Sequence, residues 1–195
     1  MSSKNIETRD RILIATLKSL EANAAPTVRM SDIAKAAKIS RQAVYLHFPT
    51  RAELLIAATH YLDHIKDVDH RLEKSRNAKT GKQRLNAYIE AWGNYIPEIY
   101  GVAKALLAMK DTDEAANIAW SGRMNAVREG CEAAIMALKK DGMLASDYTI
   151  DQATDVLWTM LSLRNWEQLT QQCGWTQAHY IKMMKSNADR IFVRT

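Results

Sequence analysis

The side chains best suited to contact a partner lie between residues 41 and 47. Apolar residues around and within this stretch recur at helical or turn spacing and are expected to converge as a core: Ile33, Ala34, Ala37, Ile39, Val44 and Phe48. The other positions carry a cation, an amide, small or apolar groups and two aromatic donors: Arg41, Gln42, Ala43, Tyr45, Leu46 and His47. This mixed face does not suit a core, so it predicts a contact surface.

The positive charge of the chain is concentrated beside this surface. The 195 residues carry a formal net charge of +5 at pH 7. Residues 1–51 hold nine Lys or Arg against four Asp or Glu, whereas residues 52–195 hold 18 of each kind. Such an end attracts a polyanion such as DNA, because neutralising phosphates releases condensed counterions. A basic end alone also fits an ordinary solvated surface, so the charge gains weight only together with the helical pattern around it.

Other kinds of chemistry have little support in the sequence. Cys131 and Cys173 match no metal-binding spacing and are interpreted as two reduced structural thiols, with a redox switch as the alternative. His60 and His64 are one helical turn apart, which is compatible with a metal, but the alternating charges around them favour a solvated face. We find no glycine-rich phosphate loop, nucleophile elbow or cluster of metal ligands, so we expect no catalysis, no metal and no cofactor.

The composition favours a soluble globular protein in the cytoplasm. Hydrophobic residues make up 47% of the chain, enough for a sizeable core. No run of about 18 apolar residues is present, as a membrane-spanning helix would require. The first residues, MSSKNIETRD, lack the apolar core of an export signal.

Three short helices are predicted to position the mixed face. A first helix over 5–22 carries an apolar stripe that can brace the next two. Thr27 is a suitable N-cap for a second helix ending near Ala37, and Ser40 is a suitable N-cap for the third, which carries 41–47. Pro49 is expected to end this third helix, and Thr50 with Glu53 forms a capping box for a fourth.

Residues 5–60 resemble the N-terminal DNA-binding domain of the TetR family of transcriptional repressors. The resemblance is carried by TVRMSDIAKAAKIS at 27–40, AVYLHF at 43–48 and PTRAELL at 49–55. Together these stretches include the turn, the Tyr-x-His-Phe ending and the cap of the following helix. One residue departs from the family pattern: Lys38 occupies the turn where glycine is common, and a lysine enters a left-handed conformation only at some cost.

The resemblance implies two sets of DNA contacts. Arg41, Gln42, Ala43 and Leu46 would face base edges in the major groove, where arginine suits guanine, glutamine suits adenine and apolar groups suit the thymine methyl. Phosphates would be held by hydroxyl, imidazole and guanidinium donors: Thr27, Ser40, Tyr45, His47, Thr50 and Arg51. For Tyr45, Leu46 and His47, the alternatives are a packed aromatic, an apolar packing residue and an ordinary surface histidine.

The rest of the chain reads as helices without a strand pattern. Capping boxes are predicted at Thr80 with Gln83, Asp111 with Glu114 and Thr149 with Gln152. The expected helices span 50–75, 81–96, 97–109, 112–139, 149–172 and 176–193, with Pro97 in the first turn of its helix. We therefore predict an all-α fold. Together with the TetR resemblance, it implies two domains: a three-helix helix-turn-helix domain over 1–50, and a larger helical ligand-binding and dimerisation domain over 51–195.

Large aromatic and methionine side chains are frequent in the second domain. If this domain holds a small molecule, as the resemblance implies, the candidate lining residues are Trp92, Tyr95, Tyr100, Trp120, Met124, Trp158, Arg164 and Trp166. Ordinary core packing is the alternative for each of them, because a helical core also needs such groups. The chemical identity of the ligand does not follow from the sequence.

The resemblance also implies a dimer and a mechanism. The last two helices carry wide apolar faces, and in the family they pair across a two-fold axis, so we expect a homodimer on a palindromic double-stranded DNA operator. A small-molecule inducer would release the repressor by favouring a conformation with wrongly spaced recognition helices. The alternative is a helical protein-interaction module without DNA binding, which would leave the confinement of positive charge to 1–51 unexplained.

Overall fold

The computed structural model describes residues 7–22 and 28–194. These residues form helices and no β-strand, which confirms the predicted all-α class. None of their helices combines the length and the apolar character needed to cross a membrane. The chain divides into two compact units, one made of 1–66 with 101–123 and the other of 67–100 with 124–195. The domain boundary predicted between residues 50 and 51 stays a prediction.

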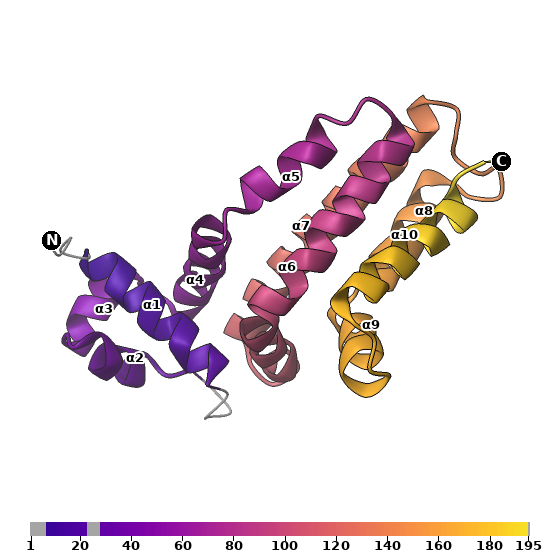
Figure 1. Ribbon diagram of the computed structural model, residues 1–195. Coiled ribbons are helices and arrows are strands. Elements are labelled where there is room, and N and C mark those ends of the chain that lie inside the picture. The colour runs from indigo at the N-terminus through magenta and orange to yellow at the C-terminus, as the bar shows by residue number, and fades with distance from the viewer. Residues whose placement is uncertain (1–6, 23–27, 195) are drawn as a thin grey trace, which may run out of the picture. The chain divides into compact units, whose positions relative to one another are not determined.

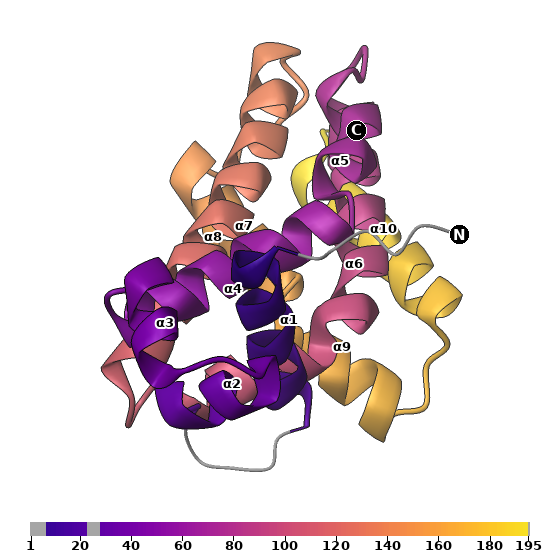
Figure 2. The same cartoon turned by 90° about the vertical axis from the view of Figure 1, so that its left-hand side faces the viewer.

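The first unit contains the helices expected around the contact surface. Helix α1 lies between α2 and α4 and packs against both, while α2 packs against α3 (Figure 2). Its core includes fully buried side chains from all four helices, namely Ile12, Leu13, Ile33, Val44, Leu54 and Leu55. The bounds are α1 (Thr8–Glu21), α2 (Met30–Ala37), α3 (Arg41–His47) and α4 (Arg51–Ile65).

The expected core positions of this unit are largely confirmed. Ile33, Ala34, Ala37, Val44 and Phe48 are buried, and Ile39 is half-buried. These side chains lie on one side of the α2–α3 pair, so the spacing of apolar residues correctly separated the packed side from the exposed one.

Among the remaining described helices, α6 and α7 are the longest, and each of them belongs to both units. Residues 101–109 of α6 and 114–123 of α7 lie in the first unit, while the rest of each helix lies in the second. In the second unit α8 and α10 run side by side (Figure 1). The bounds are α5 (Val68–Arg76), α6 (Gly81–Met109), α7 (Glu114–Lys140), α8 (Ile150–Met160), α9 (Leu163–Glu167), a π-helical turn (Gln168–Gln172) and α10 (Gln177–Phe192).

Two of the predicted helices are interrupted. The helix expected over 50–75 breaks at Asp67, whose φ of 53° is left-handed, and α5 begins after it. Short polar side chains tolerate this conformation better than most, but no glycine or proline signalled it. The helix expected over 149–172 ends at Met160, and the hydroxyl of Ser162 then caps α9 by accepting from the Asn165 amide at 3.3 Å.

The helix start predicted at Pro97 is wrong, because α6 continues through it. Proline has no amide hydrogen, so the carbonyl of Gly93, four residues earlier, loses its helical donor. The side chain of Gln177 replaces that donor, with its Nε2 at 2.6 Å from the Gly93 oxygen. Gln177 also accepts a hydrogen bond from the indole of Trp166 at 2.9 Å. A contact from α10, 84 residues away in sequence, thus supports the unbroken helix.

The predicted caps are confirmed in four places, one of them Thr50 with Glu53 at the start of α4. They are wrong in two, the first being α2, whose N-cap is Arg29 and not the predicted Thr27. Ser40 accepts from the Ala43 amide at 3.0 Å, Thr80 from the Gln83 amide at 3.2 Å, and Thr149 with Gln152 forms the full capping box. The cap predicted at Asp111 is wrong, because α7 begins at Glu114.

Candidate nucleic-acid interface

Helix α3 owes its position to a cap and two buried anchors. The Ser40 hydroxyl caps its first turn, and the chain turns extended at Phe48, just before Pro49. Val44 is fully buried and Phe48 is 3% exposed, so one side of this short helix is fixed to the core. Its other side is available to a partner.

The predicted base-contacting residues lie on that available side. Arg41 and Gln42 are exposed, Ala43 is half-buried, and Leu46 is 80% exposed. An apolar side chain that is so exposed gains nothing from the core of this unit, which makes the packing alternative for Leu46 unattractive.

Arg41 and Tyr45 form one cluster on this side. The guanidinium carbon of Arg41 lies 5.4 Å from the centre of the Tyr45 ring, and its Nη2 donates to the phenolic oxygen at 3.3 Å. This hydrogen bond raises the pKa of Arg41. The Tyr45 ring is 37% exposed and His47 beside it is exposed, so donors for phosphate oxygens border the base-contacting residues.

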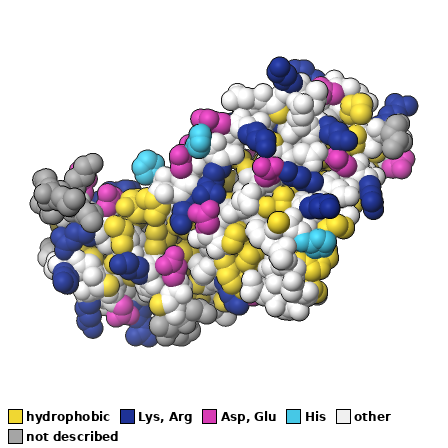
Figure 3. Space-filling model, viewed as in Figure 1, with side chains coloured by type: hydrophobic (Ala, Val, Ile, Leu, Met, Phe, Trp, Pro, Cys, Tyr) yellow, Lys and Arg dark blue, Asp and Glu magenta, His cyan; other side chains and the backbone are white. Residues whose placement is uncertain are grey.

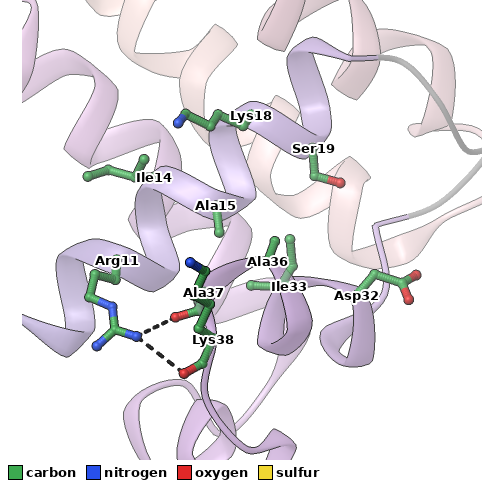
Figure 4. Close-up of a pocket in the computed structure, with 10 residues that line it drawn as sticks. All are labelled: Arg11, Ile14, Ala15, Lys18, Ser19, Asp32, Ile33, Ala36, Ala37 and Lys38. Carbon is green, nitrogen blue, oxygen red and sulfur yellow. Dashed lines mark hydrogen bonds between the residues drawn. The ribbon is translucent and has the colours of Figure 1, made fainter.

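The turn between α2 and α3 contains a left-handed residue, Lys38, at the position where the TetR family commonly has glycine. Lys38 has φ 55° and ψ 48°. Arg11 of α1 compensates part of the cost, because its guanidinium donates to the carbonyl of Ala37 at 2.5 Å and to that of Lys38 at 3.3 Å (Figure 4). These contacts lie at the rim of an open groove of about 480 Å³ between α1 and α2.

The last group of predicted phosphate contacts lies at the start of α4. The exposed Thr50 hydroxyl caps this helix by accepting from the Glu53 amide at 3.1 Å. Arg51 is engaged within the protein, since its guanidinium forms an ion pair with Asp113 and donates to the Val28 carbonyl at 3.3 Å. Thr27 lies outside the described residues. The phosphate roles of Ser40, Thr50 and Arg51 stay predictions.

Basic side chains surround this surface. Figure 3 shows Lys and Arg side chains, in dark blue, gathered over the part of the molecule that Figure 1 labels α2 and α3. Both helices lie in the stretch of 1–51 that holds the whole excess of positive charge. The mixed face of α3 therefore lies in a positive electrostatic field, which attracts phosphate groups.

The family comparison decides what kind of segment this is. Residues 12–58 match the family model of bacterial regulatory proteins of the tetR family. The N-terminal segment is similar to that of TetR-family proteins over these residues. The matched range begins in α1 and ends in α4, so it covers the described helices that carry the mixed face.

Solved structures extend the TetR-like fold over nearly the whole chain. A protein assigned to the TetR family of transcriptional regulators from Rhodococcus sp. is 18% identical, with a TM-score of 0.74 over 94% of this chain and 97% of that one. A TetR transcription regulator from Haloarcula marismortui is 20% identical, with a TM-score of 0.70 over 96% and 98%. The regulator FadR from Bacillus subtilis, solved with stearoyl-CoA, is 12% identical, with a TM-score of 0.72 over 93% and 96%. At these identities the comparisons establish the fold. Among curated proteins, none matches the chain.

The ligand-lining residues suggested by the TetR resemblance are distributed over both units. Trp120 belongs to the first unit, and the other seven belong to the second. Tyr95 and Trp166 are each 4% exposed, which suits the packing alternative, whereas Arg164 is exposed. Trp92 donates to the Leu161 carbonyl at 2.8 Å.

Two of these aromatic residues meet directly. The rings of Tyr100 and Trp166 lie 5.0 Å apart, and the Tyr100 hydroxyl donates to Glu167. The indole of Trp166 is bonded to Gln177, as described above. These polar groups are therefore engaged within the protein, and a ligand role for the aromatic set stays a prediction.

Sequence reasoning missed two residues of the TetR-like segment's surroundings. No local pattern predicts the contact of Arg11 with the turn, because only the packing of α1 on α2 creates it. Asp113 was missed although an aspartate before an apolar run is a cap signal. The Glu three residues after Asp111 favoured that position instead.

Proposed function

We propose that the protein is a DNA-binding transcriptional regulator that reads duplex DNA with α3. The observation that carries the proposal is the exposed face of Arg41, Gln42, Tyr45 and Leu46 within a segment that matches the TetR family. Arginine and glutamine suit bidentate contacts with guanine and adenine, and an exposed leucine suits the thymine methyl. Tyr45, His47 and the capped start of α4 border that face with phosphate donors.

We propose that the protein acts as a homodimer, with α8 and α10 forming the interface. Two recognition helices about 34 Å apart would read successive turns of a palindromic operator. The buried face of α10 consists of Tyr180, Met184, Ala188 and Phe192, spaced four residues apart, so it faces the core of its own unit. Ala178 of α10 is exposed, as a contact between protomers requires.

The proposed regulation is steric repression that a small molecule relieves. A ligand releases the operator only if it binds more tightly to the conformation that does not fit DNA. FadR from Bacillus subtilis was solved with stearoyl-CoA, which supports a ligand-binding role for the larger, aromatic-rich part over 51–195. A cytoplasmic location and the absence of catalysis follow from the same proposal.

A gel-shift titration of the DNA upstream of the protein's own gene tests the function. Binding should weaken steeply between about 50 and 200 mM salt, by about 10³-fold or more if six or more phosphates are contacted. Tyr45→Ala should weaken binding, whereas Met136→Ala should not, since Met136 is an exposed hydrophobic residue of α7 far along the chain from α3. Absence of salt-sensitive duplex binding would instead favour the alternative, a helical protein-interaction module without DNA binding.

A further inference from the structure

Arg51 joins three separate segments of the first unit. It is the first residue of α4, and its side chain is 28% exposed. One arm of the guanidinium donates to the carbonyl of Val28, two residues before α2 begins, and another arm pairs with Asp113. The helix-turn-helix lies between Val28 and Arg51, so this side chain closes the segment at its two ends.

Asp113 holds that side chain from a buried position. Its side chain is 3% exposed, and its Oδ1 also accepts the amide of Ala116 at 3.2 Å, which caps α7. Its backbone carbonyl accepts the Asn117 amide at 2.9 Å. Its other oxygen, Oδ2, is buried without a hydrogen-bond donor among the described residues. Burial alone would raise the pKa of this carboxyl, but Arg51 and the backbone amides outweigh burial and lower the pKa.

Because of these contacts, moving the Arg51 guanidinium from Asp113 to a DNA phosphate would be unfavourable. If the guanidinium moved to DNA, the carboxylate of Asp113 would remain buried with only backbone donors around it. Leaving one member of a buried pair uncompensated is strongly unfavourable. Tyr45, His47 and Thr50 do not carry this cost, because they are exposed.

We propose that Arg51 is a positioning residue, which fixes α3 by clasping Val28 and Asp113, and that it does not contact a phosphate. The role rests on the proposed DNA-binding function. Arg51 holds the entry to α2 against the first turn of α4, and both α2 and α3 lie between these two points in the sequence. Asp113, 62 residues away, becomes a residue on which operator affinity depends although it does not touch DNA.

Operator affinity measured by fluorescence anisotropy over a series of salt concentrations separates the two roles of Arg51. Arg51→Met removes the clasp, and Asp113→Asn keeps a capping side chain but removes the charge. We expect each variant and the double variant to lose affinity by a similar factor, with an unchanged slope of log K against log salt. Loss of a phosphate contact would instead reduce the slope by about 0.9.

The opposite pattern overturns the positioning role. That pattern is a reduced slope in Arg51→Met together with undiminished affinity in Asp113→Asn. Arg51→Lys provides a second measurement if Arg51→Met does not fold. Lysine keeps the charge but cannot reach both partners as a fork, so affinity should still fall, whereas a simple phosphate contact would be retained.

Arg123→Met is the matched control. Arg123 of α7 pairs with Asp63 of α4, so the variant breaks another ion pair of α4 within the first unit. That pair lies about 18 Å along α4 from Arg51, at 1.5 Å per residue. The control should lower the Tm without the loss of affinity, and an equal loss would contradict a specific clasp. Absence of salt-sensitive binding by the unmodified protein would defeat the proposed function and the clasp together.

Discussion

Gln42 is the residue of α3 whose role is easiest to isolate. It is exposed and makes no described contact with the Arg41–Tyr45 cluster. An amide that reads adenine discriminates between bases by about 1–3 kcal/mol. We expect Gln42→Ala to lower affinity for the preferred operator while leaving non-specific binding unchanged, which competition against a set of single-base operator variants would measure.

Tyr45→Phe is the comparison for that experiment. A hydroxyl that contacts a phosphate carries no sequence information, so its removal should weaken binding to all of the operators by a similar factor. If Tyr45→Phe altered base preference and Gln42→Ala did not, the two assignments would have to be exchanged.

Lys38 gives a second prediction at the scale of single residues, and this one concerns stability. Its left-handed backbone costs a lysine about 1–2 kcal/mol, whereas glycine adopts it freely but loses about 0.5–1 kcal/mol of additional chain entropy on folding. Lys38→Gly should therefore raise the free energy of unfolding by about 0.5–1 kcal/mol. Chemical denaturation measures the change, with Lys38→Ala as the control that keeps the strain. Equal stability of the two variants would show that the turn is not strained.

Helix α6 provides the prediction at the scale of elements. Gln177→Ala leaves the Gly93 carbonyl and the Trp166 indole without their described partners, which should lower the free energy of unfolding by about 1–3 kcal/mol. Pro97→Ala restores a backbone donor four residues after Gly93. Gln177→Ala should thus cost less in the Pro97→Ala background, as a double-mutant cycle by thermal unfolding can measure. Identical costs in both backgrounds would rule out this compensation.

Local signals predicted some elements well, and tertiary contacts decided the others. Ser40 and Thr149 are caps whose partners lie three residues away, so the sequence contains the whole interaction. The continuity of α6 through Pro97 depends on a hydrogen bond from Gln177, and the Arg51 side chain is held within the protein by its ion pair with Asp113. No local pattern contains contacts between residues so far apart, so the sequence could predict neither the contact within the second unit nor the one at the candidate site.

Association is the property to test at the scale of the whole molecule. One chain has a mass of 22.1 kDa, and sedimentation should yield twice that value if α8 and α10 pair between protomers. Ala178→Arg places a charge on the exposed part of α10 and should shift the protein toward the monomer. Lys139→Ala, at an exposed position of α7, is the control. An unchanged dimer in Ala178→Arg would place the interface elsewhere.

The two cysteines differ in a way that makes the protein convenient for spectroscopy. Cys131 is fully buried, and burial raises the pKa of its thiol to about 12, which leaves it protonated and inaccessible to labelling reagents. Cys173 is exposed, just before the turn that leads into α10. A thiol-reactive spin label should therefore modify the unaltered chain at one site. In a dimer the two labels would report one distance, measurable with and without DNA.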